Sequence, residues 1–348
     1  MCDIFTTVHV GYLTLFNSIV STLQAKTFSI ENAAVVSTYF GFLVQLIPVY
    51  IILFTTHTFW DTALKKVACT LVAIIFMAPE IWLNTTNSHF IFGFITFLIM
   101  LISTSNLSIM QKYLFRMLLL IGGLTGPASI LFTPMFIVKT YREKSREKII
   151  QASILTICAI IQTIIIMYAI LYNNTYHRLS ASDFKRTIYH LMVDNFSLNI
   201  DILSYTFNFL FAIVMATYYI YLLIKTRKDN DYLISLLSLL IVGSFSTLGS
   251  LNMGGSPRYT YIPTCIYMIV IISEVFDRKI NQKKHTYFAT TILIISLAVN
   301  LYYYLPTMET VYSPNFPKWA DEVAKWRADS TYALRIHPGS NANQCIKL

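Results

Sequence analysis

Long apolar runs separated by short basic loops constrain this chain more than any other feature. Only 12% of its 348 residues are charged, whereas a soluble domain carries about twice that fraction. Several runs approach the roughly 20 apolar residues that a helix needs to cross a bilayer core. The expected membrane segments are 32–57, 67–79, 88–105, 113–138, 150–172, 200–225, 232–251, 259–276 and 286–305. The sequence therefore predicts an all-α, polytopic transmembrane helix bundle with about nine or ten membrane segments, whose partner is the lipid bilayer.

The distribution of basic residues predicts the orientation of this bundle. Sixteen of the 26 lysines and arginines fall in loops that would share one side: Lys65, Lys66, Lys112, Arg116, Lys139, Arg142, Lys144, Arg146, Lys148, Lys225, Arg227, Lys228, Arg278, Lys279, Lys283 and Lys284. That side should be cytoplasmic, because lysine and arginine are enriched there. The number of membrane crossings places all these loops on one side only if 113–138 does not cross the membrane and is instead a re-entrant pair of short helices, folded back between Gly122 and Pro127. A single kinked crossing is the alternative.

Both ends of the chain are expected outside. Residues 1–31 form an outer interfacial segment, residues 32–305 the transmembrane helical domain, and residues 306–348 a short outer C-terminal tail. The apolar residues of the first segment recur with helical spacing, which is typical of a helix lying along the membrane surface. These residues are Leu13, Phe16, Ile19, Val20 and Leu23. An outer N-terminus implies either a first crossing that inserts N-terminus-out or a chain that lacks an initial crossing helix, and we favour the second.

The composition excludes several function classes. The net charge of +9 comes mostly from the short loops, so it does not indicate nucleic-acid binding. The five cysteines have no metal-ligand spacing, and three lie in apolar runs. The sequence also lacks a Walker A motif, a His-Glu-x-x-His motif and a Gly-x-Ser-x-Gly motif. Soluble enzyme classes are therefore not supported.

Arg258 is the first candidate site residue. It follows the helix-breaking Gly-Gly-Ser-Pro turn at 254–257 and precedes the apolar run 259–276. A charge at the mouth of a membrane segment is costly unless it snorkels to the interface, pairs, or binds an anion. Interfacial snorkelling and a phosphate or carboxylate clamp are both consistent with this position.

Two acids are candidates for proton transfer. Glu80 follows an apolar run and a proline, so partial desolvation there would raise its pKa and suit a base or a metal ligand. Asp3 is an acid at the start of the chain. The structural alternatives are an interfacial acid in water for Glu80 and a disordered terminus for Asp3.

Several short stretches together resemble the GT-C type of membrane glycosyltransferase. This group includes the polyprenyl-phosphate-sugar-dependent mannosyl and aminoarabinose transferases, and related uncharacterised bacterial membrane proteins show the same pattern. The stretches are His9-Val10-Gly11-Tyr12, Ala78-Pro79-Glu80, Asn87-Ser88-His89, Gly123-Leu124-Thr125-Gly126-Pro127, Arg258-Tyr259 with Pro263, and the tail with Trp319 and Trp326. The likeness covers most of the chain, although each piece is degenerate.

The resemblance implies a helical enzyme of the bacterial inner membrane with an outward-facing cavity. Asp3 would match the acid of the first outer loop, and Glu80 a second catalytic acid. Arg258, Tyr259, His89 and Asn87 would bind the lipid phosphate or the substrate. A divalent cation is compatible with this family, but no ligands are assigned. Two departures are the missing first crossing and the reduction of the large outer domain to residues 306–348.

The function expected on these grounds is sugar transfer from a polyprenyl-phosphate donor on the outer face. An envelope polysaccharide polymerase or ligase is a related alternative. A multi-pass transporter or flippase belongs to another class, but the sequence shows neither an inverted repeat nor many charges within membrane segments. A non-catalytic membrane protein is the remaining alternative.

Overall fold

The computed structural model describes residues 8–9, 11–76, 81–105, 107–172, 184–196, 205–250, 257–276, 283–311, 317–335 and 345–346. Within this part the chain is all-α, apart from two pairs of two-residue strands. The α-helices are α2 (Leu15–Thr27), α3 (Ala33–Phe54), α4 (Ala63–Ile75), α5 (Ser88–Leu101), α6 (Ile109–Gly123), α7 (Ala128–Glu143), α8 (Arg146–Tyr172), α9 (Phe184–Phe196), α10 (Tyr205–Thr226), α11 (Asn230–Ser250), α12 (Tyr261–Phe276), α13 (Lys283–Val311) and α14 (Trp319–Ala328). The strands are β1 (Val8–His9) with β2 (Tyr12–Leu13), and β3 (Leu334–Arg335) with β4 (Cys345–Ile346). Short 3₁₀ helices are η1 (Ile30–Asn32), η2 (Thr58–Trp60) and η5 (Pro257–Thr260).

Four helical stretches are long and apolar enough to cross a membrane. They are Ile30–Phe54, Arg146–Leu171, Thr206–Thr226 and Arg258–Phe276. The predicted all-α fold is therefore confirmed, and four of the expected membrane segments, 32–57, 150–172, 200–225 and 259–276, coincide with these stretches. The helices α4 and α5 have 13 and 14 residues, or about 20 Å each. Helix α4 ends at Ile75, inside the expected segment 67–79, and α5 ends at Leu101, before the end of the expected segment 88–105.

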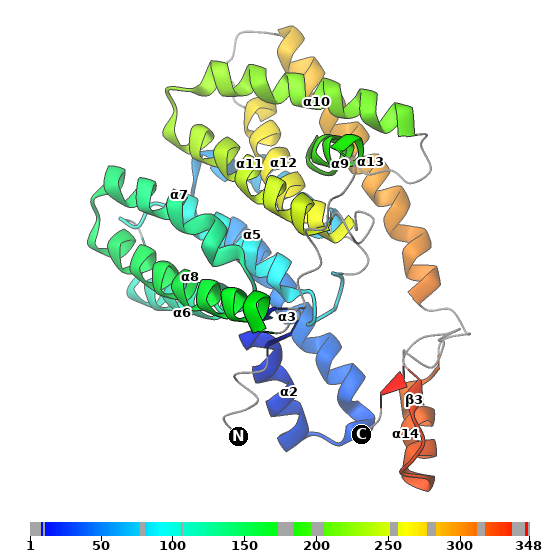
Figure 1. Ribbon diagram of the computed structural model, residues 1–348. Helices are drawn as coiled ribbons and strands as arrows, with labels where there is room; N and C mark the ends of the chain where they lie inside the picture. Colours follow the sequence, from blue (N-terminus) through cyan, green and yellow to red (C-terminus); the bar gives the residue numbers. More distant parts are fainter. Residues whose placement is uncertain are drawn as a thin grey trace.

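Helix α5 is the centre of the bundle (Figure 1). Every residue of α5 except His89 is buried, and the helix packs against α3, α6, α7 and α12. Its apolar residues cover the whole circumference rather than one stripe, as expected for a helix enclosed by protein. Gly93 allows the approach of α12, because a Cβ there would lie 2.5 Å from Ile262 Cδ1.

Helices α6 and α7 form an antiparallel pair joined by the turn at 124–127. Arg116, in α6, pairs with Glu147 in the first turn of α8, and the Cys158 thiol, farther along α8, lies 3.8 Å from the Leu120 carbonyl. Helix α7 then runs back to the start of α8, where the Thr140 hydroxyl donates to the Lys148 carbonyl at 3.2 Å. The sequence break expected between Gly122 and Pro127 is thus a reversal of the chain, and the reversal lies beside the middle of α8.

The N-terminal segment meets this reversal. Leu15 N donates to Leu124 O at 3.0 Å, and Gly126 N donates to Leu13 O at 3.0 Å. The fully buried Gln162, in the second half of α8, completes the junction: Leu13 N donates to its Oε1 and its Nε2 donates to Leu13 O, both at 3.0 Å. These contacts satisfy backbone groups that would otherwise be buried without partners.

Ion pairs join the helix ends that carry the basic loops, which we call the basic end. Asp231, at the start of α11, pairs with Lys139 of α7 and accepts a hydrogen bond from His57 Nε2 at 3.0 Å. Lys225 pairs with Glu274 at 2.6 Å. The predicted loops 139–149 and 225–231 therefore share one end of the bundle. Loop 277–282 lies outside the described residues.

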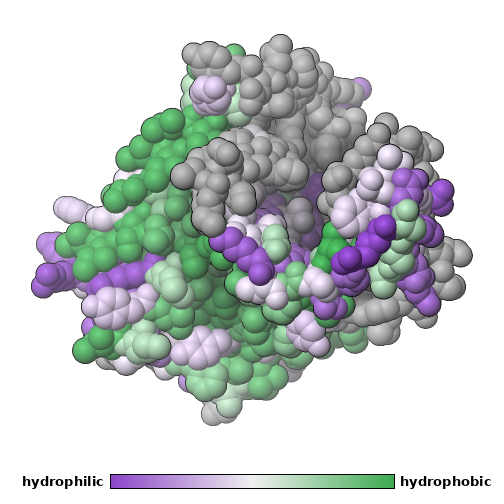
Figure 2. All heavy atoms as spheres, turned by 90° about the horizontal axis from the view of Figure 1, so that it is seen from below, coloured by the Kyte–Doolittle hydropathy of each residue, from purple (hydrophilic) through white to green (hydrophobic). Residues whose placement is uncertain are grey.

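The other end, which we call the opposite end, gathers the segments expected outside. Asn17 of α2 accepts a hydrogen bond from Ser88 at 3.1 Å. The C-terminal tail also lies at this end, where Trp319 Nε1 donates to Ile30 O at 2.7 Å. Figure 1 shows α14 beside the start of α3, remote from α10. Figure 2 shows a broad hydrophobic surface with hydrophilic residues at its edges.

Candidate functional site

Arg258 and His89 lie in one aromatic cluster at the opposite end. The Arg258 guanidinium carbon lies 5.3 Å from the centre of the Tyr259 ring, a cation–π distance. Tyr259 meets Phe90 edge to face, with ring centres 5.5 Å apart. Phe90 in turn lies against the His89 ring, with ring centres 4.1 Å apart. The chain thus brings a half-buried cation and a histidine from a different helix into one cluster.

The local structure explains how Arg258 is positioned. Proline fixes the backbone at residue 257, where η5 begins, and this short helix leads directly into α12. Helix α12 is buried along almost its entire length, so its start is held firmly against α11 and α5. Arg258 is therefore attached to a rigid element, a requirement for precise binding.

His89 is positioned by three segments. Its Nε2 lies 3.5 Å from the Tyr12 hydroxyl, a long contact, and the two rings meet edge to face with centres 5.6 Å apart. The Phe90 ring lies 4.1 Å away, centre to centre. Gly126 packs on the other side, where a Cβ would lie only 2.7 Å from the His89 Cβ. Gly126 has a φ of +108°, a value that glycine adopts without strain.

Asn87 and the preceding loop bring the site to the start of α5. Asn87 is buried at the N-cap position, and its carbonyl accepts from Phe90 N at 3.1 Å. Gly41 of α3 allows this loop to pass, since a Cβ on it would lie 2.6 Å from the Leu83 carbonyl carbon. Four of the six predicted site residues, namely Arg258, Tyr259, His89 and Asn87, thus lie at one end of the molecule.

The two predicted acids, Asp3 and Glu80, lie outside the described residues. Their catalytic assignment stays a prediction. Among the residues that the structure describes, no group of three or more histidine, cysteine, aspartate or glutamate side chains is placed to hold a metal ion. A divalent cation also remains a prediction without assigned ligands.

Sequence reasoning did not assign Tyr12, Phe90 or Gly126 to the site. Tyr12 and Gly126 belong to stretches that carry the family resemblance, so their motifs were a usable signal. Phe90 has no such signal, because one phenylalanine in an apolar helix looks like any other. The contact between Tyr12 and His89 joins residues 77 positions apart, and neither periodicity nor spacing predicts such a contact.

The basic end holds a second polar feature, a cavity of about 400 Å³. Its lining consists of Lys139, Arg142, Glu143, Lys228, Asp229, Asn230 and Asp231. The three cations and three carboxylates balance, and several are already paired with one another. The ion pairs in this lining hold helix ends together. The lining has no net charge with which to select an anion.

The cluster around Arg258 can bind an oxyanion. A guanidinium presents several donors in a planar fork that matches phosphate or carboxylate oxygens. Comparison with known proteins adds no assignment: no family model, curated protein or solved structure matches this chain.

Proposed function

We propose that this protein is a multi-pass membrane glycosyltransferase of the GT-C type, which transfers a sugar from a polyprenyl-phosphate donor. The observation that carries the proposal is that ring contacts through Tyr259 and Phe90 bring Arg258 and His89 into one cluster at the end opposite the basic loops. A half-buried arginine on a rigid helix start suits a lipid phosphate, because it reaches the phosphate without leaving the membrane interface.

The proposed topology follows the basic residues. The protein lies in the bacterial inner membrane, with the basic end on the cytoplasmic side. The opposite end, with Arg258 and the tail, lies on the outer side. Helices α6 and α7 have 15 and 16 residues, or about 23 Å each. They are too short for two full crossings and form a re-entrant pair whose turn lies within the membrane. Non-helical backbone is tolerated there when protein surrounds it, as Gln162 and the N-terminal segment do here.

The proposed reaction is a displacement at the anomeric carbon of the donor sugar. A hydroxyl oxygen of the acceptor forms the new glycosidic bond while the bond to the phosphate oxygen breaks. The polyprenyl phosphate leaves with the electron pair, and Arg258 stabilises its developing charge. The acceptor proton passes to a carboxylate, for which Glu80 and Asp3 are the candidates. Asn87, His89 and Tyr259 orient the substrate.

The test compares two substitutions of Arg258. If the arginine holds a phosphate, Arg258→Lys loses much of the activity because lysine lacks the planar fork. Arg258→Ala loses more, since a charge-assisted contact of about 1.5–3 kcal/mol disappears, roughly a tenfold to hundredfold effect. The measurement is envelope glycan modification in cells, normalised to the amount of protein in the membrane.

A matched control is Arg335→Ala, which removes an exposed arginine from the tail at the same end. It should leave glycan modification unchanged. Snorkelling alone predicts that lysine substitutes freely for Arg258, because both side chains reach the interface. Full activity in Arg258→Ala would remove the phosphate-binding role and the main support for the transferase proposal.

A further inference from the structure

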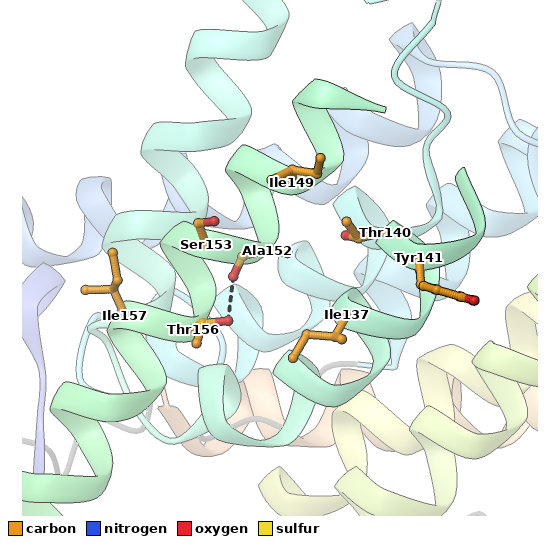
Figure 3. Close-up of a pocket in the computed structure, with 8 residues that line it drawn as sticks. All are labelled: Ile137, Thr140, Tyr141, Ile149, Ala152, Ser153, Thr156 and Ile157. Atoms are coloured by element: carbon orange, nitrogen blue, oxygen red, sulfur yellow. Dashed lines mark hydrogen bonds between the residues drawn. The ribbon is translucent and has the colours of Figure 1, made fainter. Parts of the chain in front are cut away.

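An apolar groove lies between α7 and α8, and Figure 3 shows the side chains of both helices that line it. Its volume is about 570 Å³. The lining residues are Ile137, Thr140 and Tyr141 of α7, with Ile149, Ala152, Ser153, Thr156 and Ile157 of α8. On each helix these positions follow an i, i+3, i+4 pattern, so each set occupies one face. From Ile149 to Ile157 the groove extends about 12 Å along the helix axis.

The groove presents carbon rather than hydrogen-bonding groups. The Thr140 hydroxyl donates to the Lys148 carbonyl at 3.2 Å, and the Thr156 hydroxyl donates to the Ala152 carbonyl at 2.7 Å. Both threonines therefore satisfy their donors on the backbone. Ile149 and Ile157 are each more than half exposed. This surface suits an acyl chain, which has no polar groups to offer.

The turn beside the groove carries an excess of positive charge. Its two acids are compensated, because Glu143 pairs with Lys139 at 3.1 Å and Glu147 pairs with Arg116. Lys144 and Arg146 are exposed and make no ion pair within the described part of the chain. Arg146 is three residues before Ile149 and seven before Ser153, so it lies on the face of α8 that bears the groove.

The backbone at Lys144 is consistent with a role for its charge. Lys144 ends α7 with φ 50° and ψ 26°, the left-handed conformation in which helix ends usually carry glycine. A lysine here is less favourable for the backbone than glycine would be. The chain nevertheless places a cation three residues after Tyr141, in the turn that joins the two helices of the groove.

We propose that this groove binds an anionic phospholipid of the leaflet that faces the basic end. One acyl chain lies along α7 and α8, and the headgroup phosphate contacts Lys144 and Arg146. Basic side chains next to an apolar groove between helices select such lipids by charge. Tyr141 stands at the headgroup level, where tyrosine is favoured. The proposed site is separate from Arg258, which lies at the opposite end of the bundle.

The experiment measures lipid retention by the purified full chain in detergent, using native mass spectrometry. The probes are dioleoylphosphatidylglycerol and dioleoylphosphatidylcholine. The unsubstituted protein should retain the anionic lipid in clear preference to the zwitterionic one. Arg146→Gln should lower that retention about fivefold, since a basic residue near a membrane surface contributes about 1 kcal/mol. Arg227→Gln, an exposed arginine on another turn of the basic end, should not change it.

Two further variants separate binding from folding. Lys144→Gly relieves the left-handed backbone, so the protein should unfold at a higher temperature while retaining about fivefold less anionic lipid. Ser153→Phe fills the groove from an exposed position and should abolish the bound lipid. Ile164→Phe, at an exposed position of α8 beyond the groove, should have no effect.

The proposal is overturned by equal retention of the two lipids. It is also overturned if Arg227→Gln costs as much as Arg146→Gln, because the basic end would then attract lipid only through its general charge. A dimer that Ser153→Phe dissociates would show that a second copy of the chain occupies the groove instead.

Discussion

The two ends of the bundle use polar residues in different ways. At the basic end, polar side chains bind one another or backbone carbonyls: Asp231 joins Lys139 and His57, and the buried Lys148 donates to the carbonyls of Ile99 and Met100 at 3.1 and 2.9 Å. At the opposite end, Arg258 and His89 are positioned mainly by aromatic rings.

This difference indicates what each end does. The carbonyls to which Lys148 donates are among the last of α5, so this lysine caps the central helix. At the opposite end, ring contacts instead position Arg258 and His89, the residues that the proposed reaction uses. We therefore expect substitutions at the basic end to change mainly stability, and substitutions at the opposite end to change mainly activity.

The largest stability effect should come from Asp231→Asn. The Lys139 ammonium is almost fully buried, and removing the charge of Asp231 takes away one of its two ion-pair partners and leaves it only Glu143 among the described residues. The free energy of unfolding should fall by about 2–3 kcal/mol. Thermal unfolding in detergent measures this loss. The control Asp321→Asn, an exposed acid of the tail, should change stability by less than about 0.5 kcal/mol. Equal effects of the two variants would mean that the basic end does not hold the bundle together.

The same carboxylate should make stability depend on acid pH. Burial raises the pKa of Asp231, but the hydrogen bond from His57 and the charge of Lys139 outweigh burial and lower it to about 2. A lowered pKa stabilises the folded state above the unfolded-state value near pH 4, and this contribution disappears as pH falls toward 2. Unfolding midpoints between pH 5 and 2.5 should therefore fall less steeply in Asp231→Asn than in the unsubstituted protein. Parallel curves would contradict the assignment.

Gly126→Ala tests the opposite end through its backbone. Residue 126 has φ +108°, and the added methyl group would meet the His89 Cβ at 2.7 Å. Backbone strain of this kind costs about 1–3 kcal/mol, and relief of the clash must displace His89 or the turn. We expect glycan modification to fall by more than the loss of folded protein explains. In Gly122→Ala the backbone conformation is helical and the nearest contact is an adaptable Phe92 ring at 3.0 Å, so the loss should be smaller.

The sequence predicted the features that depend on local pattern. The apolar runs gave the helical membrane-type fold, and glycines with a proline gave the reversal between α6 and α7. The sequence could not distinguish a membrane crossing from an enclosed core helix, since 88–101 is apolar in either case. Nor could it predict pairs such as His57 with Asp231, which are 174 residues apart. Such contacts depend on how helices pack, and a charged residue near a helix end carries no mark of its partner.

The smallest effect should come from Arg327→Gln in the tail. Arg327 pairs with Glu31 at 2.7 Å, but both side chains are substantially exposed. Exposed pairs contribute about 0–1 kcal/mol because water and salt screen them. The tail is instead held by Trp319, whose indole donates to Ile30 O at 2.7 Å. Limited proteolysis should therefore cleave the tail of Arg327→Gln at nearly the rate of the unsubstituted protein, and that of Trp319→Ala several times faster. Equal acceleration in both variants would show that the opposite end, like the basic end, depends on ion pairing.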